Sequence, residues 1–94
     1  MNYENLADIG DEIKSYDFFG RDDHITGIVV EKNAFSYSVK VLKSVTESEE
    51  FNKLRYGQTL TVPFETMIEY EGRIQLLKTF DEGFDELLNE MVVV

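Results

Sequence analysis

Apolar and polar side chains alternate most regularly between residues 35 and 45. Serines and a lysine separate the apolar positions, which are Phe35, Tyr37, Val39, Val41 and Val45. A period of two places every second side chain on the same face of a strand. We therefore predict a strand over residues 35–45 whose apolar face is buried in the core of a sheet.

A second strand is predicted over residues 24–32, because this stretch is rich in β-branched side chains. Asn33-Ala34 suits a two-residue hairpin turn, since Asn tolerates a positive φ. The facing pairs in that register are Lys32 with Phe35, Val30 with Tyr37, and Ile28 with Val39. Gly27 indicates a bulge or a close approach of two backbones.

Three shorter strands are predicted over residues 12–18, 59–63 and 73–78. The second of them reaches Pro63, which has no N–H to donate, so this strand ends there or lies at an edge of the sheet. A long N-terminal helix is the alternative for the first strand. Its apolar face would consist of Leu6, Ile9, Ile13 and Tyr16.

Two short helices are predicted in the first two thirds of the chain. Residues 2–9 suit one that Gly10 ends. The other covers residues 47–54 and begins at Thr46, which has capping-box spacing to Glu49.

A longer helix is predicted at the C-terminal end of the chain. Its apolar stripe consists of Phe80, Phe84, Leu87, Leu88 and Met91. A helix of this kind is marginal alone, so we expect it to pack on the sheet or on a second copy of the chain. The apolar end Val92-Val93-Val94 favours the same contact, and a homo-oligomer through this helix and tail is one expectation.

These elements predict a single domain over residues 1–94 that is mainly β with α (α+β). The expected architecture is a small SH3-like antiparallel barrel, or a strongly bent sheet, with a C-terminal helix packed on it. A chain of 94 residues supports one modest core.

The charge is strongly negative and unevenly distributed. Nine Lys and Arg against nineteen Asp and Glu give a net charge of −10. The net charge is −5 over residues 1–23, +1 over residues 24–64 and −6 over residues 65–94. Such a surface repels phosphate and favours a basic protein partner, which makes nucleic acid and anionic membrane poor candidates. The alternative role of this charge is solubility alone.

The candidate partner-binding residues are the acidic side chains that avoid the apolar stripe of the C-terminal helix, namely Asp81, Glu82, Asp85, Glu86 and Glu90. They form rows of residues four apart, in which neighbours lie roughly 6 Å from each other. A protein that binds DNA through Lys and Arg could accept such rows in place of phosphates. The simpler interpretation is an ordinary solvated helix face.

The sequence lacks the residues and motifs that most catalytic sites require. The chain has no Cys, one His, and neither a phosphate-binding glycine loop nor a GxSxG motif. Asp22-Asp23-His24 is the one local cluster of potential metal ligands, and adjacent residues on a strand point to opposite faces. We therefore expect no catalytic residue, no metal and no cofactor. Residues 1–20 show no secretory signal, so we expect a cytoplasmic protein without a membrane span.

Several segments resemble those of short, uncharacterised phage-encoded proteins with SH3-like barrels. They are Gly10-Asp11-Glu12-Ile13-Lys14-Ser15-Tyr16-Asp17-Phe18, then Asp23 to Val29, Tyr37 to Val41, Gly57 to Pro63 and Gly72-Arg73-Ile74. The resemblance implies a compact barrel of phage or phage-derived origin and assigns a role to no residue. This chain departs from the pattern at His24, where an aromatic residue is expected, and in its added acidic C-terminal helix.

The predicted function is a non-catalytic interaction module, a phage accessory protein that binds a basic host protein through its acidic surface. One alternative is a nucleic-acid-binding SH3-like barrel. Five bases against four acids over residues 24–64 predict no basic patch for it. Another alternative is a structural or assembly component of a virion.

Overall fold

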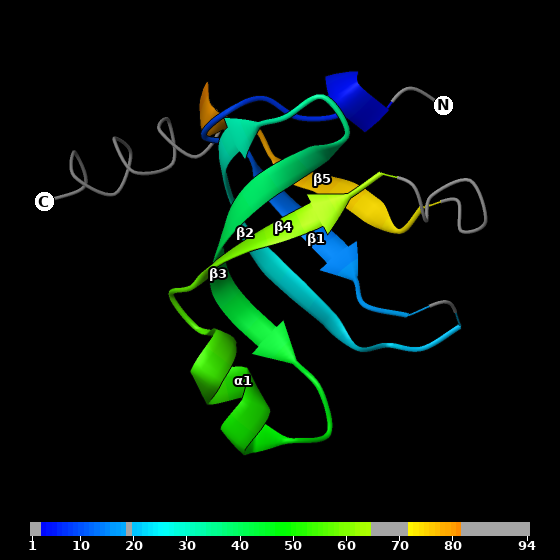
Figure 1. Cartoon of the computed structure of the whole chain (residues 1–94), viewed down its shortest axis with the longest axis vertical. Helices are drawn as coiled ribbons and strands as arrows, with labels where there is room; N and C mark the ends of the chain where they lie inside the picture. Colours follow the sequence, from blue (N-terminus) through cyan, green and yellow to red (C-terminus); the bar gives the residue numbers. More distant parts are fainter. Residues whose placement is uncertain (1–2, 19, 65–71, 82–94) are drawn as a thin grey trace, which may run out of the picture.

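A computed structural model describes residues 3–18, 20–64 and 72–81, which form a five-stranded antiparallel sheet (Figure 1). The strands are β1 (Glu12–Tyr16), β2 (His24–Lys32), β3 (Ser36–Val45), β4 (Thr59–Pro63) and β5 (Ile74–Lys78). All five predicted strands are thereby confirmed. The alternative long N-terminal helix is wrong, because Ile13 and Tyr16 belong to β1.

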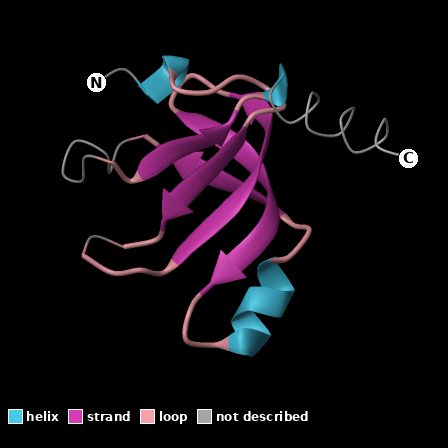
Figure 2. Cartoon of the chain, turned by 180° about the vertical axis from the view of Figure 1, so that it is seen from behind, coloured by secondary structure: helices cyan, strands magenta, loops and turns pink. Residues whose placement is uncertain are grey.

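Two short helices flank the sheet. The 3-10 helix η1 (Tyr3–Asn5) precedes β1, and α1 (Glu49–Arg55) connects β3 to β4. They lie at opposite ends of the sheet (Figure 2). The predicted N-terminal helix is thus shortened to a single turn. Of the predicted C-terminal helix, Phe80 and Asp81 have helical backbone, and residues 82–94 lie outside the described part of the chain.

The sheet is open at both edges. Its strand order is β4-β3-β2-β1-β5, so β4 and β5 form the edges. The long strands β2 and β3 curve strongly (Figure 1), and one core cluster contains residues of all five strands. Its buried members are Ala7, Ile13, Ile25, Val29, Tyr37, Val39, Val41, Val62 and Ile74. The mainly β fold is confirmed, whereas the strand pairing does not close the sheet into a barrel.

The β2–β3 hairpin has a different register from the predicted one. Lys32 pairs with Tyr37, and the Asn33 N–H donates to the Ser36 carbonyl at 2.9 Å, so the connection is longer than two residues. At the turn the pairing is shifted by two residues from the predicted one, and Val30, an extra residue that forms a bulge, takes back one of them. Val39 therefore faces Val29 rather than Ile28. A shift of one residue exchanges the two faces of a strand.

The prediction that Phe35 and Val30 lie on the buried face is therefore wrong. Phe35 lies in the turn and is 79% exposed, and Val30 is 43% exposed. Tyr37 is confirmed as a core residue, and Phe64 is partly buried against the core. The alternation predicted the strand correctly, but it could not reveal where a bulge changes the register.

A second irregularity lies opposite Gly27, where β3 contains the extra residue Leu42. The backbones approach closely there. A Cβ atom on Gly27 would lie 2.3 Å from the carbonyl oxygen of Lys40 and 2.7 Å from Cγ1 of Val39. The predicted close approach at Gly27 is confirmed, and it explains why no side chain fits at this position.

We expect Gly27→Ala to lower the free energy of unfolding by at least about 2 kcal/mol, because the methyl group would overlap the backbone of β3. Gly20→Ala is the matched control. Gly20 has a φ of 74° but no atom within 4 Å of the added Cβ, so Gly20→Ala should cost about 1 kcal/mol, from its positive φ alone. Urea denaturation measures both values. Equal losses at the two glycines would contradict a close approach at Gly27.

Tyr37 connects the N-terminal segment to the core. Its side chain is fully buried, and its ring meets Phe64 edge-on at a centroid distance of 4.9 Å. The hydroxyl oxygen accepts a hydrogen bond from the backbone N–H of Ala7 at 3.2 Å. Burial raises the pKa of the Tyr37 hydroxyl above its ordinary value. The folded chain therefore keeps the Tyr37 hydroxyl neutral to a higher pH than the unfolded chain does.

This raised pKa predicts a loss of stability in alkali. Above pH 10 the unfolded chain releases the Tyr37 proton while the folded chain retains it, so stability falls as the pH rises further. Tyr37→Phe should remove this contribution to the slope. It should also lower the free energy of unfolding at neutral pH by about 1–2 kcal/mol, since the Ala7 N–H loses its acceptor. Thermal unfolding between neutral pH and pH 11 tests both effects.

Tyr56→Phe is the control, because the Tyr56 side chain is exposed. An alkaline slope that Tyr37→Phe leaves unchanged would show that Tyr37 ionises equally in both states.

Candidate functional site

A groove of about 650 Å³ lies between α1, the start of β4 and the loop after β1. We call it the Phe18–Phe51 groove. Its apolar wall consists of Phe18, Phe51 and Leu60, and its charged lining consists of Asp17, Asp23, Glu47 and Arg55. Phe18 and Phe51 are each about half exposed (53% and 48%). The groove thus presents two accessible phenyl rings beside carboxylates.

The helix α1 begins directly after its N-cap residue, Ser48. The Ser48 side chain accepts a hydrogen bond from the Phe51 N–H at 3.2 Å, and Glu49 and Glu50 occupy the first turn, where acidic residues are favoured. The cap is therefore Ser48 and not the predicted Thr46. Thr46 has another role, because its hydroxyl donates to the Asn52 side-chain oxygen at 2.8 Å.

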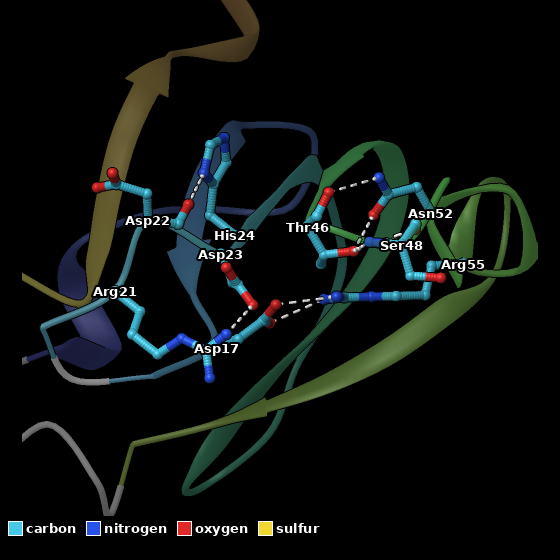
Figure 3. Close-up of polar contacts among 9 residues, drawn as sticks. All are labelled: Asp17, Arg21, Asp22, Asp23, His24, Thr46, Ser48, Asn52 and Arg55. Atoms are coloured by element: carbon cyan, nitrogen blue, oxygen red, sulfur yellow. Dashed lines mark hydrogen bonds and ion pairs between the residues drawn. The ribbon is translucent and has the colours of Figure 1, made fainter. Parts of the chain in front are cut away.

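Asn52 holds α1 against the end of β3 (Figure 3). Its side-chain oxygen also accepts a hydrogen bond from the Ser44 hydroxyl at 2.9 Å, and its amide nitrogen donates to the Thr46 carbonyl at 3.3 Å. These bonds fix the helix relative to the sheet. Phe51, one residue before Asn52, is therefore presented from a firmly held support.

The base of the groove contains an ion pair between residues far apart in the sequence. Arg55 is only 8% exposed, and its two terminal nitrogens donate to the two oxygens of Asp17 at 2.8 and 2.9 Å (Figure 3). The Arg55 guanidinium also lies 4.9 Å from the ring centroid of Phe51. This bidentate geometry is the strong form of an arginine–carboxylate contact. It connects α1 to the end of β1 and neutralises the charge of Arg55.

The loop between β1 and β2 forms the opposite wall. Arg21 donates to Asp23 at 3.3 Å, and its guanidinium lies 5.0 Å from the ring centroid of Phe18. The His24 ring nitrogen Nδ1 lies 2.6 Å from the Asp22 carbonyl oxygen. Asp22, Asp23 and His24 thus make separate contacts. Within residues 3–18, 20–64 and 72–81, no group of three or more acidic or histidine side chains could hold a metal ion.

The charged lining leaves the groove anionic. Its lining has three carboxylates and one guanidinium, a net charge of −2. Asp17 is paired with Arg55 and Asp23 with Arg21. Glu47 is therefore the carboxylate that the groove presents at its rim. Glu47 is exposed at the rim, where a second hollow of about 410 Å³ shares Asp23, Thr46 and Glu47 with the groove. The arrangement suits a ligand with an apolar group for the phenyl rings and a cationic group for the rim.

Of the acidic residues predicted to bind a partner, Asp81 is the one that the structure describes, and it does not line this groove. Asp81 is exposed, next to Phe80 at the end of β5. Glu82, Asp85, Glu86 and Glu90 lie outside the described residues. Sequence reasoning missed the groove because its two walls come from separate segments. The available signal was the pair Phe18 and Phe51, since Phe18 is the last residue of a predicted strand and Phe51 lies outside the predicted strands.

The structure does bring the two acidic ends of the described chain together. The buried carboxylate of Asp11 accepts hydrogen bonds from the Asp8 N–H at 2.8 Å and the Phe80 N–H at 2.7 Å. A Cβ atom on Gly10, whose φ is 95°, would lie 3.0 Å from the Phe80 ring. The N-terminal acidic segment therefore lies beside the start of the C-terminal one.

The chain matches no protein-family model, no curated protein and no solved structure. The resemblance to phage proteins and the SH3-like assignment therefore stay predictions. In the described part of the chain, no helix has the length and apolar composition needed to cross a membrane.

Asp17→Asn should lower the free energy of unfolding by about 2–4 kcal/mol, because Arg55 would lose its charged partner while remaining buried. Asp23→Asn is the control, since its partner Arg21 is exposed and such pairs contribute little. Chemical denaturation of both variants tests the difference. An Asp17→Asn variant as stable as Asp23→Asn would refute a structural role for the Asp17–Arg55 pair.

Proposed function

We propose that this protein is a non-catalytic interaction module that binds a basic segment of a partner protein in the Phe18–Phe51 groove. The observation that carries the proposal is the pairing of two half-exposed phenyl rings with an anionic rim. Aromatic side chains are the usual anchors of protein interfaces. The preferred ligand is therefore a peptide in which a large apolar residue is flanked by Lys or Arg.

The support of the groove favours specific binding. The Asn52 hydrogen bonds hold α1, and the Asp17–Arg55 pair connects α1 to the opposite wall. A site that is already ordered loses less conformational entropy when a ligand binds.

The net charge of −10 supports the same class of partner. Long-range attraction raises the rate at which a basic partner meets an acidic surface. In this proposal the acidic residues of the C-terminal segment, Asp81, Glu82, Asp85, Glu86 and Glu90, strengthen that attraction. More specifically, the proposal holds that these acidic residues, spaced four apart, imitate the phosphates of a nucleic acid.

The proposal also includes an SH3-like type for the fold. The consecutive pairing of β1 to β4, with β5 returning to β1, supports a half-barrel of SH3-like type. A phage accessory role in the host cytoplasm fits a small acidic module of this kind, and its support is the resemblance of the segments between Gly10 and Ile74 to phage proteins.

Selection of short random peptides on the immobilised protein tests the proposal. We expect enriched peptides to share a large apolar residue with Lys or Arg within three positions. Their affinity should fall as salt is added, since the rim contacts are electrostatic. Enrichment of acidic peptides would contradict the proposal.

Matched variants then locate the site. Phe51→Ser should weaken the selected peptides about tenfold or more, as expected for a central anchor. Leu54→Ser, an exposed position on the same helix outside the groove lining, should leave their affinity nearly unchanged. Glu47→Gln should lower the association rate more than Glu50→Gln. Equal effects at residues 51 and 54 would place the binding elsewhere.

A further inference from the structure

The outer face of the sheet gathers basic side chains from β1, β3 and β5, together with Arg73 just before β5. Buried residues of β1 and β2 alternate with outward ones, so Glu12, Lys14 and Tyr16 share a face with His24, Thr26 and Ile28. The register then aligns cross-strand rows. One row contains Gln75, Lys14, Thr26 and Lys43, and the next contains Lys78, Glu12, Ile28 and Lys40.

A third row lies at the end of β1 and adds aromatic rings. Tyr16 pairs with His24, and its N–H donates to the Arg73 carbonyl at 2.9 Å. The Arg73 side chain returns to Tyr16, because its Nε donates to the Tyr16 carbonyl at 2.8 Å. Lys14 Nζ lies 4.7 Å from the centroid of the Tyr16 ring, and the His24 ring meets Tyr16 edge-on at 5.8 Å.

These three rows contain five of the nine Lys and Arg of the chain and one acidic residue, Glu12, for a net charge of +4. Lys14 and Lys43 are separated by one strand, which corresponds to about 10 Å between their Cα atoms. Among the residues that the structure describes, the guanidinium nitrogen Nη1 of Arg73 is buried and has no hydrogen-bond partner. An unpaired donor calls for an acceptor, so a small shift of this side chain toward a phosphate would satisfy it.

The local charge, rather than the net charge, governs contact at this face. At physiological ionic strength the Debye length is about 8 Å, so acidic groups beyond that distance are largely screened. The face is also distinct from the Phe18–Phe51 groove, since no residue of the three rows lines that groove.

We propose that the outer face of β5, β1, β2 and β3 binds single-stranded nucleic acid. Lys14, Lys43 and Arg73 contact successive phosphates, and the ring of Tyr16 stacks on a base. Tyr16 is partly exposed, and cations beside an aromatic ring are the combination that single-strand-binding surfaces use. An acidic peptide would also contact the Lys and Arg side chains, but it has no base to stack on the Tyr16 ring. The net charge did not predict this cationic face, because its bases lie far apart in the sequence and meet only through the register.

Fluorescence anisotropy of a labelled oligo(dT) with the full chain tests the proposal. Three phosphate contacts on a single strand give a slope of about −2 for log K against log salt, hence a loss of roughly 20-fold between 50 and 200 mM salt. Lys14→Gln and Lys43→Gln should each reduce this slope by about 0.7. Lys53→Gln on α1 is the control and should change neither affinity nor slope.

Tyr16→Leu separates stacking from charge. It should weaken oligo(dT) at least about fivefold without changing the salt slope, and it should leave the binding of polyglutamate unchanged. The groove variant Phe51→Ser should bind oligo(dT) normally. Absence of binding at about 100 µM protein and low salt would overturn the proposal. Polyglutamate binding as tightly as oligo(dT), with Tyr16→Leu without effect on either, would also overturn it and identify the face as a site for acidic proteins.

Discussion

The pairing of β2 with β3 is the constraint on which the other features depend. These two strands share the longest ladder of the sheet, and the bulges at Val30 and Leu42 decide which side chains enter the core. Val29, Val39 and Val41 point inward as a result, while Thr26, Lys40 and Lys43 point outward. Bulges also increase the local twist and bend of a strand. The curvature that lets a single open sheet enclose its own core follows from this hairpin.

The same curvature separates two surfaces of opposite charge. Near the end of β3, the helix α1 comes close enough to the β1–β2 loop for Arg55 to reach Asp17, and the anionic groove forms between them. The outward face of the sheet carries Lys14, Lys43 and Arg73. A chain with a net charge of −10 thus has a cationic face, and its two surfaces suit two different kinds of ligand.

Local patterns predicted the strands but not the contacts between distant segments. The alternation around Tyr37 and Val39 is short-range, so it identified β3 and its core side chains from the sequence. Phe35 and Val30 were assigned to the wrong face, because neither the position of the turn nor a bulge leaves a mark in the alternation. Neither the Asp17–Arg55 pair nor the cationic rows could be predicted, since 38 residues separate the ion pair and the bases lie on different strands.

Cross-strand nuclear Overhauser contacts in the β2–β3 hairpin test this account most directly, because they report the register without reference to function. The account predicts backbone proton contacts that pair Val29 with Val39 and Gly27 with Val41. Contacts that pair Ile28 with Val39 and Val30 with Tyr37 would show a regular two-residue hairpin. That result would exchange the two faces of β2 and contradict the core, the groove and the cationic face together.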